Sequence, residues 1–163
     1  MSTQDTVKSG NIFGVKIIHP EINHDDRGSL YEAARSSSCG TAINQITVTR
    51  TDPGIIKASH SHRRQTDIWL PIAGRARVVL FDLRRQSPTA HTRQIIIVDG
   101  RTPVTIVIPP GVAHGYQVLG RKEFVMVYAT SHEYNPSEPD EQRTPPDDSL
   151  ISNGGKVWRI INR

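Results

Sequence analysis

The chain has 163 residues, enough for one domain, and its 36% hydrophobic residues can fill a core without any apolar run long enough to cross a membrane. The formal net charge is +4, but the basic residues are scattered in pairs without an aromatic-rich pattern, which argues against a nucleic-acid partner. The N-terminus lacks the apolar stretch of a secretory signal and the one cysteine excludes an intrachain disulfide, so we expect a cytoplasmic protein.

Short segments rich in Val, Ile and Tyr, bounded by Gly, Pro or Asp, predict β-strands along most of the chain. No segment keeps the apolar spacing of a helix beyond two turns. The strands are expected at residues 13–18, 42–50, 67–72, 75–83, 93–98, 104–108, 113–119 and 123–129. Closely spaced strands separated by turn residues predict an all-β sandwich, jelly roll or barrel with few or no helices.

The composition changes after residue 130. Residues 131–155 contain four prolines, and five acidic residues lie between Glu138 and Asp148. This pattern predicts an extended tail over residues 137–163 in place of a helix. The apolar run at residues 157–161 would return as a last edge strand.

Three histidines are the strongest functional signal. His60 and His62 are two residues apart in GIIKASHSH at residues 54–62, and side chains with this spacing share one face of a strand. His114 follows a Pro-Pro-Gly turn far downstream. Three imidazoles that converge in a small β-protein suggest either a proton-transfer site or a metal site.

The spacing of these residues resembles the two cupin motifs. Gly54, His60, His62 and Gly74 match the first motif, in which Asp67 stands where Glu is usual. The Pro-Pro-Gly turn before His114 matches the core of the second. The resemblance implies a cupin jelly-roll barrel. In metal-dependent cupins the matching four positions hold iron, manganese or a similar ion, so one alternative is a metal site made of His60, His62, Asp67 and His114.

A more specific resemblance involves four segments in a fixed order. They are DRGSLYE at residues 26–32, FDLRRQSPT at 81–89, IPPGVAHGYQVL at 108–119 and VYATSHEYNP at 127–136. As a set they resemble the dTDP-4-dehydrorhamnose 3,5-epimerase family over residues 26–136, within a single domain spanning 1–163. The resemblance implies a homodimeric barrel without metal or other cofactor, acting on a nucleotide-linked 4-keto-6-deoxy sugar, with dTDP as the expected carrier.

Such chemistry needs a base that removes the proton α to the ketone and an acid that returns a proton on the opposite face. A histidine suits the first task and a tyrosine the second. By resemblance, His60 matches the family's catalytic histidine and Tyr128 its catalytic tyrosine. The substrate-binding positions implied in the same way are Arg27, Glu32, Gln45, Lys57, His114 and Tyr134.

The chain departs from the family at three points, and these leave alternative functions open. Asp67 occupies the position nearest to a family lysine thought to stabilise the enolate. The C-terminal carboxylate that orients the family's histidine has no counterpart, although Asp67 could reach an imidazole instead. The His60-x-His62 spacing also resembles dTDP-sugar 3,4-ketoisomerases, in which both histidines are catalytic. The alternatives are therefore a ketoisomerase, a metal-dependent cupin, or a binding module that has lost turnover.

Overall fold

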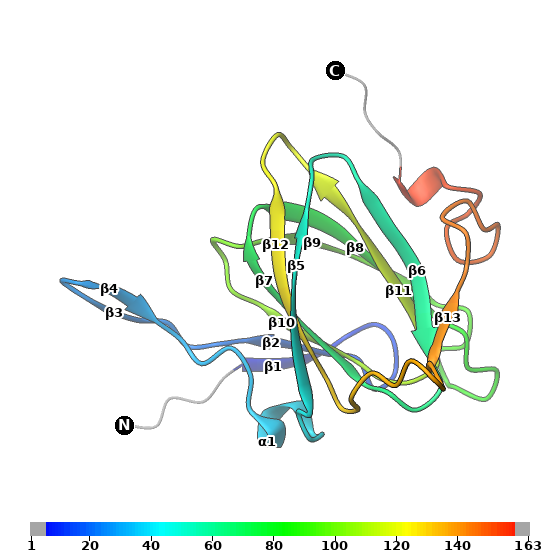
Figure 1. The fold of residues 1–163 in the computed structure, drawn as a ribbon, viewed down its shortest axis with the longest axis horizontal. Helices are drawn as coiled ribbons and strands as arrows, with labels where there is room; N and C mark the ends of the chain where they lie inside the picture. Colours follow the sequence, from blue (N-terminus) through cyan, green and yellow to red (C-terminus); the bar gives the residue numbers. More distant parts are fainter. Residues whose placement is uncertain (1–5, 159–163) are drawn as a thin grey trace.

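A computed structural model describes residues 6–158, which fold into two facing antiparallel sheets (Figure 1). The first sheet has the order β1-β2-β10-β7-β12-β5, with β1 at Thr6–Ser9, β2 at Lys16–His19, β10 at Thr105–Ile108, β7 at Asp67–Ala73, β12 at Phe124–Thr130 and β5 at Gln45–Thr51. The second has the order β13-β6-β11-β8-β9, with β13 at Glu141–Arg143, β6 at Ile56–His62, β11 at Val112–Leu119, β8 at Arg75–Asp82 and β9 at Arg93–Asp99. From β5 to β13 the chain crosses to the other sheet after every strand except β8, which is followed by its neighbour β9, as in a jelly-roll barrel. The predicted fold class is therefore confirmed.

The core lies between the sheets and is filled from both of them. Trp69, Ile106 and Phe124 come from the first sheet, whereas Val78 and Leu80 come from the second. These side chains belong to one buried cluster, and none is more than 5% exposed. Burial of β-branched and aromatic side chains on two opposed faces stabilises a sandwich of this kind.

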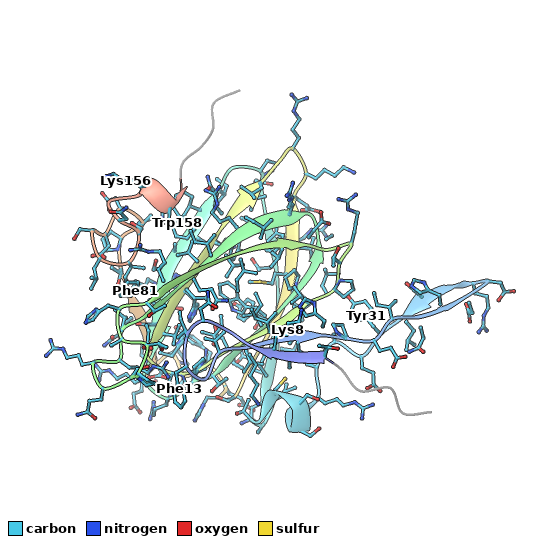
Figure 2. All side chains as sticks on the ribbon, turned by 180° about the vertical axis from the view of Figure 1, so that it is seen from behind. Lys8, Phe13, Tyr31, Phe81, Lys156 and Trp158 are labelled. Atoms are coloured by element: carbon cyan, nitrogen blue, oxygen red, sulfur yellow. The ribbon has the colours of Figure 1, made fainter. Side chains whose placement is uncertain are left out.

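A short hairpin projects from the barrel body (Figure 1). It pairs β3, Asn23–Asp25, with β4, Gly28–Leu30. The Asp25 carboxylate closes the turn by accepting hydrogen bonds from the backbone amides of Arg27 and Gly28. Figure 2 shows Tyr31 at the point where this arm rejoins the barrel. A four-residue helix, α1 at Ser36–Cys39, then leads into β5. Among residues 6–158 there is no helix with the length and apolar character needed to span a membrane.

The tail after β12 packs against the outside of the second sheet. Its strand β13 extends that sheet beside β6, which the tail's composition did not predict. Ile151 then joins Phe81 and Ala113 in a small buried cluster. The expected strand at residues 157–161 is wrong for its first two residues, because they lie in a single 3₁₀ turn at Lys156–Trp158 (Figure 2); residues 159–161 lie outside the described part.

The local reason for this turn is visible at its start. Gly154 and Gly155 both adopt the left-handed conformation, with φ of 62° and 76°, which ends any extended path. The indole nitrogen of Trp158 donates a hydrogen bond of 2.8 Å to the carbonyl of Pro146, so the turn folds back on the tail itself.

Candidate active site

A cavity of about 980 Å³ opens between the two sheets at the end where β13 joins β6. This volume is suitable for a drug-sized or nucleotide-sized ligand. Seven of the nine catalytic and binding residues predicted from the sequence line it: His60, His62, His114, Tyr128, Gln45, Lys57 and Tyr134. Segments far apart in the sequence therefore contribute to one chamber.

His60 enters the cavity from β6, in the second sheet. Its Nδ1 atom lies 3.7 Å from Oε2 of Glu141, which the pairing of β13 with β6 brings alongside. Burial lowers the pKa of His60 below its ordinary value, and the Glu141 carboxylate opposes this shift without overcoming it. The imidazole is therefore neutral at physiological pH, which is the form that can accept a proton.

Glu141 itself is held in place from the other side. Its Oε1 atom accepts a hydrogen bond of 2.5 Å from Nε of Arg143. Burial raises the pKa of Glu141, but the hydrogen bond from Arg143 and the neighbouring positive charges outweigh burial and keep the pKa below its usual value. Glu141 thus remains ionised beside His60. The sequence interpretation missed this residue, and its one signal was the acidic composition of the tail.

Tyr128 lines the same cavity from β12, in the first sheet. On β12 it pairs with Thr47 of β5 on one side and with Trp69 of β7 on the other. Burial raises the pKa of the Tyr128 phenol above its ordinary value. The phenol therefore keeps its proton at neutral pH and can act as a donor. His60 and Tyr128 consequently face one chamber from opposite sheets.

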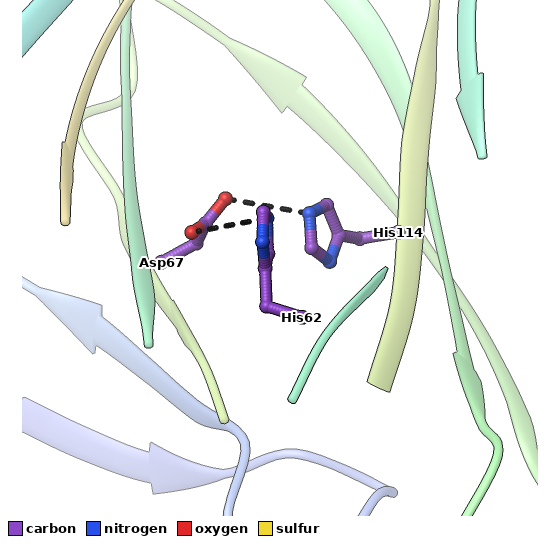
Figure 3. A group of neighbouring side chains, drawn as sticks. All are labelled: His62, Asp67 and His114. Carbon is purple, nitrogen blue, oxygen red and sulfur yellow. Dashed lines mark ion pairs between the residues drawn. The ribbon is translucent and has the colours of Figure 1, made fainter. Parts of the chain in front are cut away.

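Asp67 brings two other histidines together on the cavity wall (Figure 3). Its Oδ1 atom lies 3.6 Å from Nε2 of His62, and its Oδ2 atom lies 3.3 Å from Nε2 of His114. All three side chains are buried. Burial raises the pKa of Asp67, but contacts with His114, His62 and Gln65 together hold the pKa below its usual value. Asp67 thus reaches two imidazoles, whereas the carboxylate beside His60 is that of Glu141.

Backbone carbonyls fix both of these rings. Nδ1 of His62 donates a hydrogen bond of 3.0 Å to the carbonyl of Asp140, and Nδ1 of His114 donates one of 3.0 Å to the carbonyl of Val112. The rings stack with centroids 5.4 Å apart. Gly115, which follows His114, allows β11 to approach β6 closely, since an added Cβ would lie 2.4 Å from Cβ of Ala58.

The remaining predicted binding residues divide into two groups. Gln45, Lys57 and Tyr134 lie at the cavity, where the Gln45 side-chain oxygen accepts a hydrogen bond of 2.8 Å from the backbone amide of Tyr134. Arg27 and Glu32 do not line the cavity within a single chain. Arg27 pairs with Asp25 on the projecting hairpin, and Glu32 pairs with Arg35 just after it.

Comparison with known proteins gives the following matches. A family model described as dTDP-4-dehydrorhamnose 3,5-epimerase matches residues 9–152. The spore coat polysaccharide biosynthesis protein SpsL of Bacillus subtilis is 40% identical over 141 residues, which are 86% of this chain and 93% of SpsL. A probable low-salt glycan biosynthesis epimerase, Agl13 of Haloferax volcanii, is 30% identical over 84% of this chain and 90% of its own length.

Solved structures show the same fold. The dTDP-4-dehydrorhamnose 3,5-epimerase of Bacillus anthracis, with TDP and pyrophosphate bound, superposes with a TM-score of 0.82 at 22% identity, covering 91% of this chain and 89% of that one. A dTDP-6-deoxy-D-glucose-3,5-epimerase of Legionella pneumophila, in complex with dTDP-4-keto-L-rhamnose, gives a TM-score of 0.77 at 26% identity, covering 86% of this chain and 77% of that one.

Proposed function

Because the chain belongs to the dTDP-4-dehydrorhamnose 3,5-epimerase family, we propose that it inverts a carbon next to the ketone of a dTDP-linked 4-keto-6-deoxy sugar. His60 is the proposed base and Tyr128 the proposed acid. The relative SpsL is a polysaccharide biosynthesis protein, and this supports a role in making sugar precursors for polysaccharide.

The observation that carries this proposal is the placement of His60 and Tyr128 on facing sheets around one cavity. Inversion requires a proton to leave one face of the sugar and another to arrive on the opposite face. The neutral imidazole of His60 takes the proton from the carbon α to the ketone, which leaves an enolate. The phenol of Tyr128 then returns a proton from the other side and is reprotonated by solvent. Positioned groups of this kind contribute about 10²–10⁴-fold to rate.

Three cationic side chains at the cavity support a diphosphate-bearing substrate. Lys57, Arg64 and Arg143 line the chamber together with Gln45 and Tyr134. Arginine and lysine are the side chains that recognise phosphate groups. The sugar would lie between His60 and Tyr128, with its diphosphate extending toward these cations.

We also infer that the protein is a homodimer. Ile46 and Val48 are 68% and 62% exposed on β5, which is the last strand of the first sheet and has an unpaired edge. A second copy packed there would cover both side chains. It would also give the projecting arm a surface to contact, and so a route by which Arg27 and Glu32 reach the cavity of the other copy. A cytoplasmic location is proposed because a nucleoside diphosphate sugar, which is charged, does not cross membranes unaided.

The direct test is incubation of the protein with dTDP-4-keto-6-deoxyglucose in heavy water, followed by NMR. We expect deuterium at a carbon next to the ketone, with inverted stereochemistry there. His60→Ala and Tyr128→Phe should each reduce the inverted product at least about 100-fold, in line with loss of a positioned acid or base. The exposed His19→Ala serves as the control and should keep the wild-type rate.

Each alternative predicts a different spectrum. Movement of the carbonyl from C4 to C3 would identify a ketoisomerase, and binding of dTDP without any change in the sugar would identify a binding module. Full exchange and inversion in both the His60→Ala and Tyr128→Phe proteins would refute the assigned roles.

A further inference from the structure

We propose that Asp140 is a positioning residue: it anchors the segment before β13 to the turn between β6 and β7, and so holds His60 and His62 in place at the cavity. The turn covers residues 63–66, and Asp140 lies 76 residues after Arg64. The role of His60 as the base rests on the proposed function, whereas the effect of Asp140 on the two imidazoles can be measured without a substrate.

The Asp140 carboxylate binds three consecutive backbone amides of this turn. Its Oδ1 atom accepts a hydrogen bond of 3.2 Å from the amide of Arg63. Its Oδ2 atom accepts hydrogen bonds of 2.9 Å from the amides of Arg64 and Gln65. The side chain is 15% exposed, so water competes for these amides only in part. Because hydrogen bonds to an ionised acceptor are stronger than those between neutral groups, one carboxylate joins the two segments firmly.

The same amides keep the carboxylate ionised. Burial raises the pKa of Asp140, but the hydrogen bonds from the three amides outweigh burial and hold the pKa below its usual value. The charge of Asp140 therefore contributes to the anchor at neutral pH, together with the position of its two oxygens.

The backbone of Asp140 contacts a cavity histidine directly. Its carbonyl accepts the 3.0 Å hydrogen bond from Nδ1 of His62. The carbonyl and the carboxylate belong to one residue, so a shift of the anchored side chain also moves the acceptor that orients this imidazole.

The next residue extends the effect to the proposed base. Glu141 pairs with His62 in the register of β13 and β6, and its Oε2 atom lies 3.7 Å from Nδ1 of His60. This contact depends on where β13 begins, and Asp140 immediately precedes that strand. A misplacement of about 1 Å can cost roughly 100-fold in rate, so a loose start of β13 would slow proton abstraction.

The anchored segment is otherwise loosely packed. Residues 132–139 are exposed, and Pro139 and Asp140 line both the cavity and a smaller pocket of about 380 Å³. Glu138 lies 3.5 Å from Arg64, but both side chains are more than half exposed, and such ion pairs contribute little to stability. A segment with few buried apolar contacts opens locally at low cost in free energy, so its position depends on the polar contacts of Asp140.

The kinetic test compares Asp140→Ala with the wild-type full-length protein. Steady-state turnover of dTDP-4-keto-6-deoxyglucose gives kcat, and calorimetry with dTDP gives Kd. We expect kcat to fall about tenfold or more while Kd changes less than about threefold, because dTDP lacks the sugar on which the histidines would act.

A second measurement needs no substrate. NMR of isotope-labelled histidine side chains follows the Nδ1 proton of His62, which the Asp140 carbonyl accepts, and the His62→Ala protein identifies this signal. Buried, hydrogen-bonded protons exchange slowly with water, and we expect exchange at least about tenfold faster in Asp140→Ala. The His60 resonances should shift as well, because Glu141 would move away from Nδ1.

Two further variants separate the anchor from a general effect on the tail. Asp140→Asn keeps a side-chain oxygen that accepts amide hydrogen bonds but loses the charge, so it should lie between the wild type and Asp140→Ala in kcat and in proton exchange. Asp147→Ala is the matched control, since it removes an exposed carboxylate from the same tail, and it should match the wild type in every measurement.

Wild-type kcat and histidine signals in Asp140→Ala would overturn the proposal, and so would an Asp140→Asn protein no better than Asp140→Ala. Equal losses of kcat and dTDP affinity with a lower melting temperature would show that Asp140 only supports the fold, and would also overturn it. If Asp140→Ala does not fold, Asp140→Glu replaces it, because the longer side chain keeps the charge but displaces the carboxylate; unchanged kcat and proton exchange there would contradict the role.

Failure of this proposal is distinct from failure of the proposed function. If the wild-type protein leaves the sugar unchanged, the proposed function is wrong, and exchange of the His62 proton still decides whether Asp140 positions the histidines.

Discussion

At the scale of single residues, Asp82 explains one of the most distinctive sequence segments. Its side chain is fully buried at the end of β8, where it accepts hydrogen bonds from the Arg84 guanidinium, the Ser87 hydroxyl and the Thr89 hydroxyl. Burial alone would raise the pKa of Asp82, but these donors outweigh burial and hold the pKa far below its usual range. The FDLRRQSPT segment is therefore a structural device that fixes the loop between β8 and β9.

Replacing this carboxylate should destabilise the protein. Asp82→Asn removes the charged acceptor shared by several donors, and we expect it to lower the free energy of unfolding by at least about 2 kcal/mol at pH 7. Because the folded-state pKa is depressed, the stabilisation is complete above the unfolded-state pKa of about 4 and declines as the pH falls below it. Urea unfolding at pH 7 and pH 3 should therefore show a smaller gap between the two proteins at pH 3.

The exposed Asp26→Asn protein is the control for this experiment and should match the wild type at both pH values. A gap that stays constant, or widens, between pH 7 and pH 3 would show that the Asp82 charge is not the source of the stabilisation.

Glu141 provides a second prediction at this scale, for the proposed reaction. Glu141→Gln removes the charge beside Nδ1 of His60, so the base is less well oriented and its protonated form is no longer stabilised. We expect kcat to fall about tenfold or more while KM changes little. Steady-state kinetics of Glu138→Gln, on the same tail but paired with Arg64, provide the comparison. Equal losses in both proteins, or a change confined to KM, would exclude a positioning role for Glu141.

At the scale of elements, the sequence predicted strands well where burial determines them. The segments at residues 67–72, 75–83 and 113–119 correspond closely to β7, β8 and β11, whose residues are mostly buried. Each of these strands contains a short apolar stretch or several β-branched and aromatic residues, which predict a strand without strict alternation. The expected strand at 13–18 is displaced to Lys16–His19, because Gly14 adopts a positive φ and extends the preceding turn.

The strands that were not predicted are polar. β13 consists of Glu, Gln and Arg, and its extended form results from pairing with β6 more than from its own composition. The hairpin strands β3 and β4 are similarly short and exposed. The same limit applies to the candidate site. The histidines and Tyr128 lie in recognisable sequence motifs, whereas Glu141 reaches His60 only through the pairing of β13 with β6, which local sequence does not encode.

At the scale of the whole molecule, two terminal strands expose apolar side chains but differ in their position relative to the projecting arm. Both β5 and β9 are terminal strands, and both carry exposed isoleucine or valine side chains. The arm lies between β2 and β5 in the chain, and both of these strands belong to the first sheet, whereas β9 belongs to the second (Figure 1). This asymmetry favours β5 as the surface at which two copies associate.

We therefore predict that Ile46→Lys combined with Val48→Lys shifts the protein toward monomers. Placing charges on an apolar edge strand opposes association. Analytical ultracentrifugation over a range of concentrations would measure the shift. The matched control is Ile95→Lys with Ile97→Lys on β9, where the side chains are 50% and 48% exposed, and this protein should remain dimeric. Dissociation in both double variants, or in neither, would count against β5 as the interface.

The late position of β13 has a consequence for biosynthesis. Asp140, whose carbonyl fixes His62, follows it by 78 residues, and Glu141 comes immediately after. On a translating ribosome the barrel strands emerge first, and domains assemble as units once their segments are available. The nascent polypeptide therefore gains the contacts that Asp140 and Glu141 make with His62 and His60 only after residue 141 has emerged, and a fragment released before β13 would lack them.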